Sequence, residues 1–350
     1  MRRLIQSIFL VGIALNIYGQ SSTIDLTAMK KEREAQRYYN KAVQLVNAED
    51  YYGALEELNK SITTMPDFAK AYVERGKIYY KKERYTDASA EFQKAIDLEA
   101  SFGEAYFLLA YSRFSLDTSS VEAADFGKAI TNNYKQPEAY YYRGLIYLLD
   151  GELDLALADF NIAIDNNEQY AKAYHDRATT KIRLGDLQGA IHDYRMCVSY
   201  RPDYITGYIN MGLAKKRIGD YQGAEMDFTA AIDADTTNYI PYNNRGGSRF
   251  ILGDFEGAKA DFVKAYELQP ESIDVLANMG SITAQEGTYE EAIDWFNKAI
   301  EINPDHPQAV LNRGLTFEML GQLEDACADW KHAAELGVED ANEYIKECQE

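Results

Sequence analysis

Residues 243–249, with the sequence NNRGGSR, have the composition of an anion-binding loop. Two amides, two arginines and paired glycines could bring hydrogen-bond donors and positive charge to a phosphate group or a nucleic-acid backbone. Phosphate-binding motifs of this kind need a loop that follows a strand and opens a helix. The elements around the segment therefore decide whether it can act in this way.

The chain around this segment repeats itself every 34 residues, without insertion or deletion. In each repeat the eighth position is Gly or Ala, the twenty-fourth is large and apolar or aromatic, and the twentieth is Ala in all but one. Such a fixed period is typical of a solenoid. The nine repeats are residues 35–68, 69–102, 103–136, 137–170, 171–204, 205–238, 239–272, 273–306 and 307–340.

Two helices per repeat account for this pattern. At about 100° per residue, positions 4, 8 and 11 share one face of a first helix, and positions 20, 24 and 27 share one face of a second. A Gly-Asp pair, such as Gly253-Asp254, breaks the chain between them. Over residues 35–340 the pattern resembles the tetratricopeptide repeat family. The resemblance implies an all-α, right-handed superhelical solenoid of helix-turn-helix repeats.

The third repeat departs from the pattern. Glu122 stands where the other repeats have Ala, and no glycine marks the turn. We expect a local change of pitch or a frayed turn here, and no site.

The two ends of the chain differ from the repeats. Arg2 and Arg3 precede a short apolar stretch, residues 4–18, which predicts a secretory signal peptide over residues 1–19. An uncleaved amino-terminal anchor is the alternative. Residues 20–34 form a polar lead segment, and residues 341–350 are expected to form a cap helix. A cleaved signal predicts export to the periplasm or cell envelope of a Gram-negative bacterium, with no membrane insertion of the mature chain.

Charges at positions 7 and 23 occur together. Both positions lie at the edge of the buried stripe, where an arginine stem can pack while its head meets a carboxylate. The predicted ion pairs within repeats are Arg75–Glu91, Arg143–Asp159, Arg177–Asp193, Arg245–Asp261 and Arg313–Asp329. Lys41 and Glu57 match them in the first repeat, whereas the third and sixth repeats lack the basic partner. A row of arginines for an anionic ligand is the functional alternative.

Positions 2, 6, 9 and 13 lie opposite the buried stripe, so they are expected to line the concave groove that solenoids present to partners. We divide this groove into three zones. The basic zone is Lys70, Lys77 and Lys81, which Glu74 partly offsets. The apolar zone is Tyr111, Tyr142, Leu145 and Leu149. The amide zone is Asn210, Asn244, Asn278 and Asn312, together with Gly247, which carries no side chain.

Four successive amides could each donate to and accept from the backbone of an extended peptide. They are similar to the asparagine ladder in the tetratricopeptide superhelix of the O-linked N-acetylglucosamine transferase. Ordinary solvated asparagines are the alternative. The carboxylate clamp of chaperone-tail-binding cochaperones needs Lys at position 5 and Asn at position 9 of one repeat, and no repeat here has both.

Little in the sequence favours catalysis, a cofactor or a metal. The four histidines form no metal-binding doublet and no spaced set with cysteine. The net charge of −20 disfavours nucleic acid. Cys197 occupies a small core position and should be inert, whereas Cys327 and Cys348 could form a disulfide that fastens the cap.

The sequence thus predicts a non-catalytic scaffold that binds a protein or extended peptide in its groove. A structural spacer that uses its outer faces in an envelope complex, and an accessory subunit of a secretion or carbohydrate-processing machine, are the alternatives. Within NNRGGSR, Arg245 is assigned to an ion pair and Gly246 to helix packing, which leaves Asn244 and Gly247 for a ligand.

Overall fold

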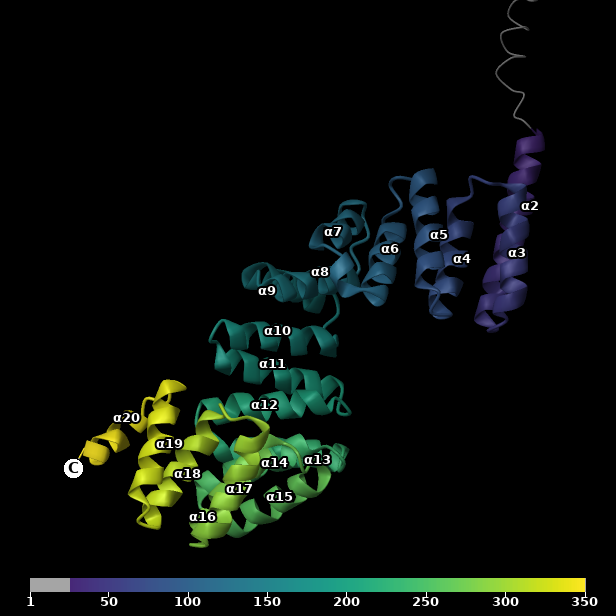
Figure 1. Cartoon of the computed structure of the whole chain (residues 1–350). Coiled ribbons are helices and arrows are strands. Elements are labelled where there is room, and N and C mark those ends of the chain that lie inside the picture. Colours follow the sequence, from purple (N-terminus) through teal and green to yellow (C-terminus); the bar gives the residue numbers. More distant parts are fainter. Residues whose placement is uncertain (1–25, 350) are drawn as a thin grey trace, which may run out of the picture. The chain divides into compact units, whose positions relative to one another are not determined.

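The computed structural model describes residues 26–349, which form α-helices and short 3₁₀ segments with no strand among them (Figure 1). The predicted all-α class with helix-turn-helix repeats is confirmed. The chain divides into two compact units, one ending at Asn166 and one beginning at Asn167. The division falls in the turn between the fourth and fifth repeats.

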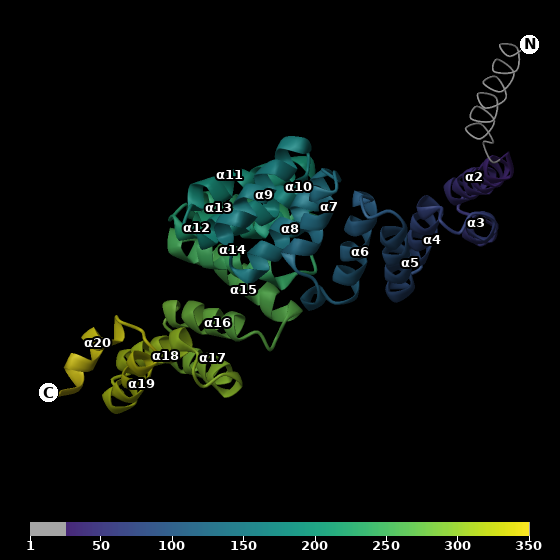
Figure 2. The same ribbon diagram turned by 90° about the horizontal axis from the view of Figure 1, so that it is seen from above.

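The first unit consists of helix pairs in which consecutive helices contact each other (Figure 2). Its elements are α2 (Leu26–Asn47), α3 (Tyr51–Thr64), α4 (Ala69–Lys81), α5 (Tyr85–Leu98), α6 (Gly103–Leu116), η1 (Thr118–Ser120), α7 (Ala123–Thr131), α8 (Pro137–Asp150) and α9 (Leu153–Asn166).

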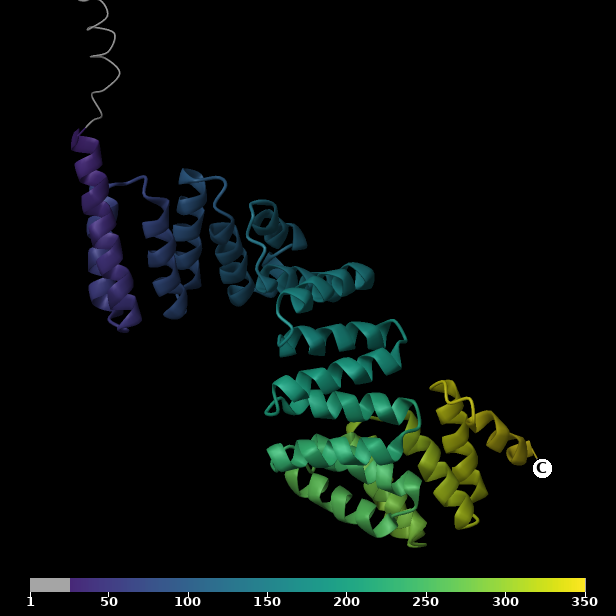
Figure 3. The same ribbon diagram turned by 180° about the vertical axis from the view of Figure 1, so that it is seen from behind.

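The second unit is built in the same way, and α10, α11 and α12 lie layer upon layer (Figure 3). Its elements are α10 (Ala171–Arg183), α11 (Leu187–Tyr200), α12 (Ile205–Arg217), α13 (Tyr221–Ala234), α14 (Tyr239–Leu252), α15 (Phe255–Leu268), α16 (Ile273–Gln285), α17 (Tyr289–Ile302), α18 (Pro307–Met319), α19 (Leu323–Glu335), α20 (Ala341–Tyr344) and η2 (Ile345–Gln349).

The Gly-Asp pair has two separate tasks in the turn within a repeat. Gly253 has φ of 84°, a left-handed conformation that glycine adopts without steric cost, and it ends α14. The carboxylate of Asp254 then accepts a hydrogen bond from the backbone N–H of Gly257 at 3.0 Å and caps α15. The dipeptide therefore fixes both the end of one helix and the start of the next.

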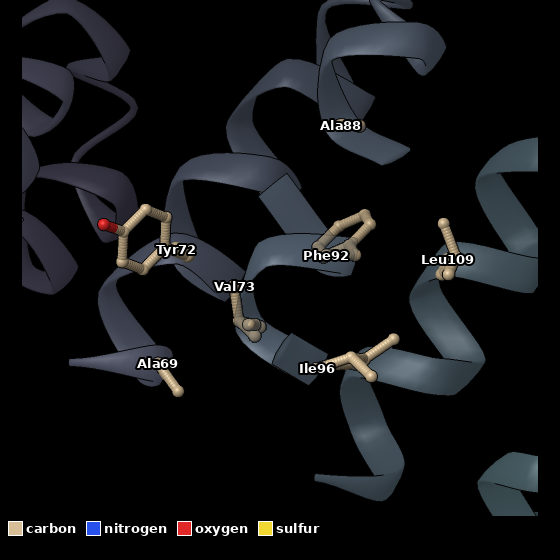
Figure 4. Packing of buried hydrophobic residues seen from close by; sticks show 9 residues of the cluster. Ala69, Tyr72, Val73, Ala88, Phe92, Ile96 and Leu109 are labelled. Carbon is tan, nitrogen blue, oxygen red and sulfur yellow. The ribbon is translucent and has the colours of Figure 1, made fainter. Parts of the chain in front are cut away.

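The core of eight of the nine repeats is an aromatic ring at position 24 set against a small residue, and the first repeat has Leu58 in place of the ring. In the second repeat, Phe92 lies among Val73, Ile96 and Leu109, with no surface exposed to solvent (Figure 4). Its ring meets the backbone of α4 at Gly76, where an added Cβ would lie 2.6 Å from Cε1. The small residue at position 8 thus allows the two helices of a repeat to approach closely.

The third repeat has the expected local irregularity. A 3₁₀ turn, η1, replaces the glycine turn, and the second helix α7 has only 9 residues. Glu122 precedes this helix, and its N–H donates to the carboxylate of Asp125 at 3.3 Å. Glu122 therefore belongs to the helix start, because the helix begins after the position at which other repeats bury an alanine.

The two ends differ in detail from the predicted segments. The predicted signal peptide, residues 1–19, lies outside the described residues. The described part of the lead, residues 26–34, is continuous with the first repeat in α2. The cap is shorter as an α-helix than expected, since α20 covers only Ala341–Tyr344 and η2 continues it. Within residues 26–349, no helix combines the length and apolar character needed to cross a bilayer.

The cap is fastened to the last repeat by an aromatic contact and a disulfide. The rings of Trp330 and Tyr344 stack with their centroids 5.4 Å apart. Cys327 and Cys348 are joined by a disulfide, with their Cα atoms 5.8 Å apart. Cys197 is a free and buried cysteine, and its burial raises the pKa of the thiol to about 12.

Adjacent glycines should respond in opposite ways to the same substitution. A Cβ at Gly246 would lie 2.7 Å from the Phe262 ring, whereas one at Gly247 would meet only the Lys216 ammonium, at 3.5 Å. We expect Gly246→Ala to destabilise the second unit by about 1–3 kcal/mol. Gly247→Ala should stabilise it by about 0.5–1 kcal/mol, because Ala is the better helix former. Urea unfolding followed by far-UV circular dichroism measures both, and equal midpoints would contradict the packing role.

Candidate functional site

The first helices of the last four repeats, α12, α14, α16 and α18, form the inner face of the second unit. Each of these helices contacts the next one directly. Side chains at their positions 6, 9 and 12 gather along this face. We call the space that they line the inner cleft, defined by Lys216, Asn244, Gly247, Phe250, Asn278, Ser281 and Asn312.

The amide zone links each repeat to the one before it. Asn278 donates to the side-chain oxygen of Asn243 at 2.8 Å. Asn312 donates to the hydroxyl of Ser281 at 3.0 Å. These bonds place the amides in fixed orientations on the inner face. Asn312 also accepts from Nε2 of Gln308 at 2.8 Å. Asn244 donates to the carbonyl of Ile240 at 3.0 Å. An asparagine amide has two hydrogens and an oxygen with two lone pairs, so each of these amides keeps at least one hydrogen and one lone pair for a ligand.

The first amide, Asn210, has different surroundings. Its Nδ2 lies 3.1 Å from Nε2 of His175, whose Nδ1 lies 2.8 Å from the carboxylate of Asp176. The His175 ring also meets the ring of Tyr194 edge-on. The structure therefore places Asn210 in a polar cluster on α10 and α12, whereas Asn244, Asn278 and Asn312 line the inner cleft.

Two hollows share a wall on the inner face. The inner cleft has a volume of about 290 Å³. A second hollow of about 570 Å³ shares Phe250, Ser281 and Asn312 with it and extends to Leu315 and Met319. Gly247 leaves the cleft open, since a Cβ built there has no neighbour within 4 Å other than the Lys216 ammonium. Amides and apolar side chains thus lie next to each other along one surface.

Lys216 is a residue of this site that the sequence analysis missed. It is half-buried at position 12, and its Nζ donates to Oδ1 of Asn244 at 3.3 Å. Burial lowers the pKa of this lysine. No carboxylate among the described residues forms an ion pair with it. The groove was assigned to positions 2, 6, 9 and 13, but positions 5 and 12, with Asn243 and Phe250, also reach the cleft.

The predicted basic zone lies in the first unit and is partly neutralised. Lys77 forms ion pairs with Glu74 at 3.0 Å and with Glu104 at 2.7 Å. Lys81 contacts both the hydroxyl and the ring of Tyr51, and Lys70 is exposed. The sequence predicted the offset by Glu74 but not the second carboxylate, Glu104 on the next inner helix, which takes up more of the Lys77 charge.

The predicted apolar zone also lies in the first unit and is an aromatic stack. The ring of Tyr111 lies between those of Tyr80 and Tyr142, at centroid distances of 5.1 Å and 4.8 Å. Leu145 is half-buried, whereas Leu149 is 60% exposed. The rings therefore pack mainly on one another, which leaves Leu149 as the most exposed member of the zone.

All five of the ion pairs expected at positions 7 and 23 are present. In each pair the arginine guanidinium contacts a largely buried carboxylate. The shortest contacts are Arg75–Glu91 at 2.9 Å and Arg143–Asp159, Arg177–Asp193, Arg245–Asp261 and Arg313–Asp329 at 2.7 Å each. The guanidinium groups of these arginines are therefore paired with carboxylates of their own repeats.

Position 11 also supplies a cation to the buried carboxylate in the middle repeats. Arg249 also reaches Asp261, at 2.9 Å, and Lys215 lies 2.7 Å from Asp227 in the sixth repeat. Lys215 therefore replaces the arginine that this repeat lacks at position 7. Burial nevertheless raises the pKa of Asp227, although Lys215 beside it acts in the opposite direction.

The number of cations around a buried carboxylate should determine how much stability is lost when one of these cations is removed. Asp159 and Asp261 are each 3% exposed, but within the described part of the chain Asp159 has Arg143 as its ion-pair partner, whereas Asp261 has Arg245 and Arg249. We expect Arg143→Met to destabilise the fold by about 3 kcal/mol and Arg245→Met by about 1 kcal/mol. Thermal and urea unfolding of both variants measures this, and equal losses would show that the second cation contributes nothing.

Residues 243–249 lie inside α14, so they are part of a helix and not a loop. Arg245 and Gly246 face the second helix of the repeat, whereas Asn244 and Gly247 face the cleft. Among residues 26–349, no three His, Cys, Asp or Glu side chains come together as a metal-binding group would require.

Family models agree with this architecture. A TPR repeat model matches residues 76–117 and 280–321, and two tetratricopeptide repeat models match residues 121–171 and residues 171–204 and 241–272. Together these matches cover more than half of the chain. The chain belongs to the tetratricopeptide repeat family, a class of protein-interaction scaffold.

Two solved structures with TM-scores above 0.5 show the same fold at low identity. The Cut9–Hcn1 hetero-tetramer of the APC/C has a TM-score of 0.55 at 15% identity, over 89% of this chain and 63% of that one. PilF of Pseudomonas aeruginosa has a TM-score of 0.52 at 18% identity, over 61% and 96%. A tetratricopeptide repeat protein of Parabacteroides merdae has 0.49 at 16%, over 79% and 97%. No curated protein matches the chain.

Proposed function

We propose that the chain is a non-catalytic scaffold that binds a partner protein by holding an extended segment of it in the inner cleft. The observation that carries this proposal is the cleft itself. Asn244, Asn278 and Asn312 follow one another along its wall, Gly247 leaves it open, and apolar side chains continue it.

An extended peptide matches this surface chemically. Its backbone offers N–H and C=O groups in turn, and the cleft amides can both donate and accept. Each such bond contributes only about 0.5–1.5 kcal/mol net, so binding needs several bonds together with burial of apolar surface. Phe250, Leu315 and Met319 provide that surface beside the amides.

A bulky residue at Gly247 should block the cleft. Tyrosine stands at the same position of the third repeat, Tyr111, so the fold accommodates it. We expect Gly247→Tyr to abolish binding of peptides selected on the intact chain from a displayed random library, measured by fluorescence anisotropy. Single alanine substitutions of Asn244, Asn278 and Asn312 should each weaken binding about twofold to tenfold, as expected for the loss of one hydrogen bond.

Two outer-face variants serve as controls. Ala260→Tyr places the same ring on exposed surface of α15, and Gln222→Ala removes an exposed amide from α13. Both should bind like the wild type. Unchanged binding by Gly247→Tyr would overturn the proposal. Loss of binding in Ala260→Tyr instead would favour the spacer that uses its outer faces.

We also propose that the chain is exported to the periplasm or cell envelope of a Gram-negative bacterium. The basic and apolar composition of residues 1–19 supports this. The disulfide between Cys327 and Cys348 supports it independently, because such bonds persist in oxidising compartments.

Export should be visible in the mass and the thiols of the chain taken from cells. We expect a product that starts near Gln20 in the envelope fraction. Titration with a thiol reagent should then find no reactive thiol in the native chain, one after unfolding and three after reduction. A full-length cytoplasmic product with three thiols after unfolding alone would contradict export.

A further inference from the structure

The inner face of the eighth repeat contains a socket of the size of a side chain. The residues at positions 9 and 12 of α16 are small, Ser281 and Ala284. Phe250 of α14 stands on one side of them, and Leu315 and Met319 of α18 stand on the other. We call this hollow the repeat-eight socket. Met319 is 61% exposed, so the socket has an apolar rim open to solvent.

Position 12 explains why the socket exists here. The third and seventh repeats carry phenylalanine at this position, as Phe114 and Phe250, and the sixth carries Lys216. A large side chain on α16 would fill the space between α14 and α18. Ala284 leaves that space empty, so a side chain from another molecule can occupy it.

Lys216 provides a second feature, on α12, two repeats before the socket. Its ammonium lies beside α14, at 3.3 Å from Oδ1 of Asn244, in the same cleft as Phe250 and Ser281. The position at the end of α12 offsets part of the cost of burying the charge, through the helix dipole. In a chain with net charge −20, a half-buried cation without an ion-pair partner among the described residues is complementary to a carboxylate.

We propose that the segment bound in the cleft inserts a large apolar side chain into the repeat-eight socket and places a carboxylate against Lys216. This inference rests on the proposed function and adds the sequence features that the cleft selects in its ligand. The carboxylate belongs either to an acidic side chain or to a free carboxyl terminus.

The spacing of the two features fixes the spacing in the ligand. The Lys216 ammonium reaches α14, which is the inner helix next to α16 of the socket. Neighbouring inner helices are on the order of 10 Å apart, and an extended chain advances about 3.3 Å per residue. The carboxylate and the apolar side chain should therefore be about three residues apart.

Selection from a random peptide library tests the pattern. The library is displayed both with free carboxyl termini and as an internal loop, and it is selected on the intact chain. We expect an acidic group about three residues from Leu, Phe or Met. Enrichment in the internal format assigns an acidic side chain, and enrichment with free termini alone assigns the terminal carboxylate. Peptides that lack either feature, or lack the spacing, would overturn the inference.

Paired substitutions in protein and peptide test each contact. Ala284→Phe should weaken binding of a selected peptide about tenfold or more. It should not weaken binding of the peptide variant that has Ala in place of the apolar residue. Lys216→Met should weaken binding of the acidic peptide about tenfold, but should not weaken binding of its amide analogue. Asn244→Asp brings a carboxylate of the chain itself to Lys216, and it should remove the same preference.

Matched controls separate this inference from the proposed function. Ala260→Phe and Lys331→Met make the same changes on exposed positions of α15 and α19, and both should leave the affinity unchanged. If Gly247→Tyr blocks binding while Ala284→Phe and Lys216→Met leave it intact, the proposed function stands and the inference is overturned. If none of the three changes binding, both are overturned.

Discussion

Everything in this fold depends on how closely the two helices of a repeat approach each other. A ring at position 24 sits directly on the backbone of the first helix, which is possible only where position 8 carries Gly or Ala. At Gly246 an added methyl group would come within 2.7 Å of the Phe262 ring. Because interiors are packed as densely as organic crystals, such a contact allows little adjustment. The repeat therefore has a fixed geometry, and its inner face can be built on a rigid frame.

The buried carboxylates follow from the same close approach. Position 23 precedes the ring at position 24, so its side chain is carried toward the first helix and loses water. Such a charge must be paired, and the arginine at position 7, or a cation at position 11, provides the partner. The pairs between Arg245, Arg249 and Asp261 show how the structure can assign two cations to one carboxylate. The arginines of this row are thus committed to the fold.

Sequence periodicity predicts contacts inside one repeat well, because a helix of 3.6 residues per turn fixes which positions face the second helix. Gly246 and the pair Arg245–Asp261 were predictable on this ground. The cleft is a different matter, because it depends on the distance from one inner helix to the next and on side-chain length. Lys216 reaches across to α14, so its role cannot be derived from its own helix alone. The second carboxylate on Lys77 was missed for the same reason, since Glu104 belongs to the next repeat.

Specificity in such a scaffold must come from the positions that packing leaves undetermined. Position 12 shows this most clearly, since it is Lys216, Phe250 and Ala284 in three consecutive repeats with the same core. The Lys216 ammonium, the Phe250 ring and the space beside Ala284 therefore follow one another along the inner face of one rigid unit. Because the spacing of the helices is set by the core, the order of these features along the chain becomes an order in space. A ligand that matches one of them must then meet the others at a defined separation.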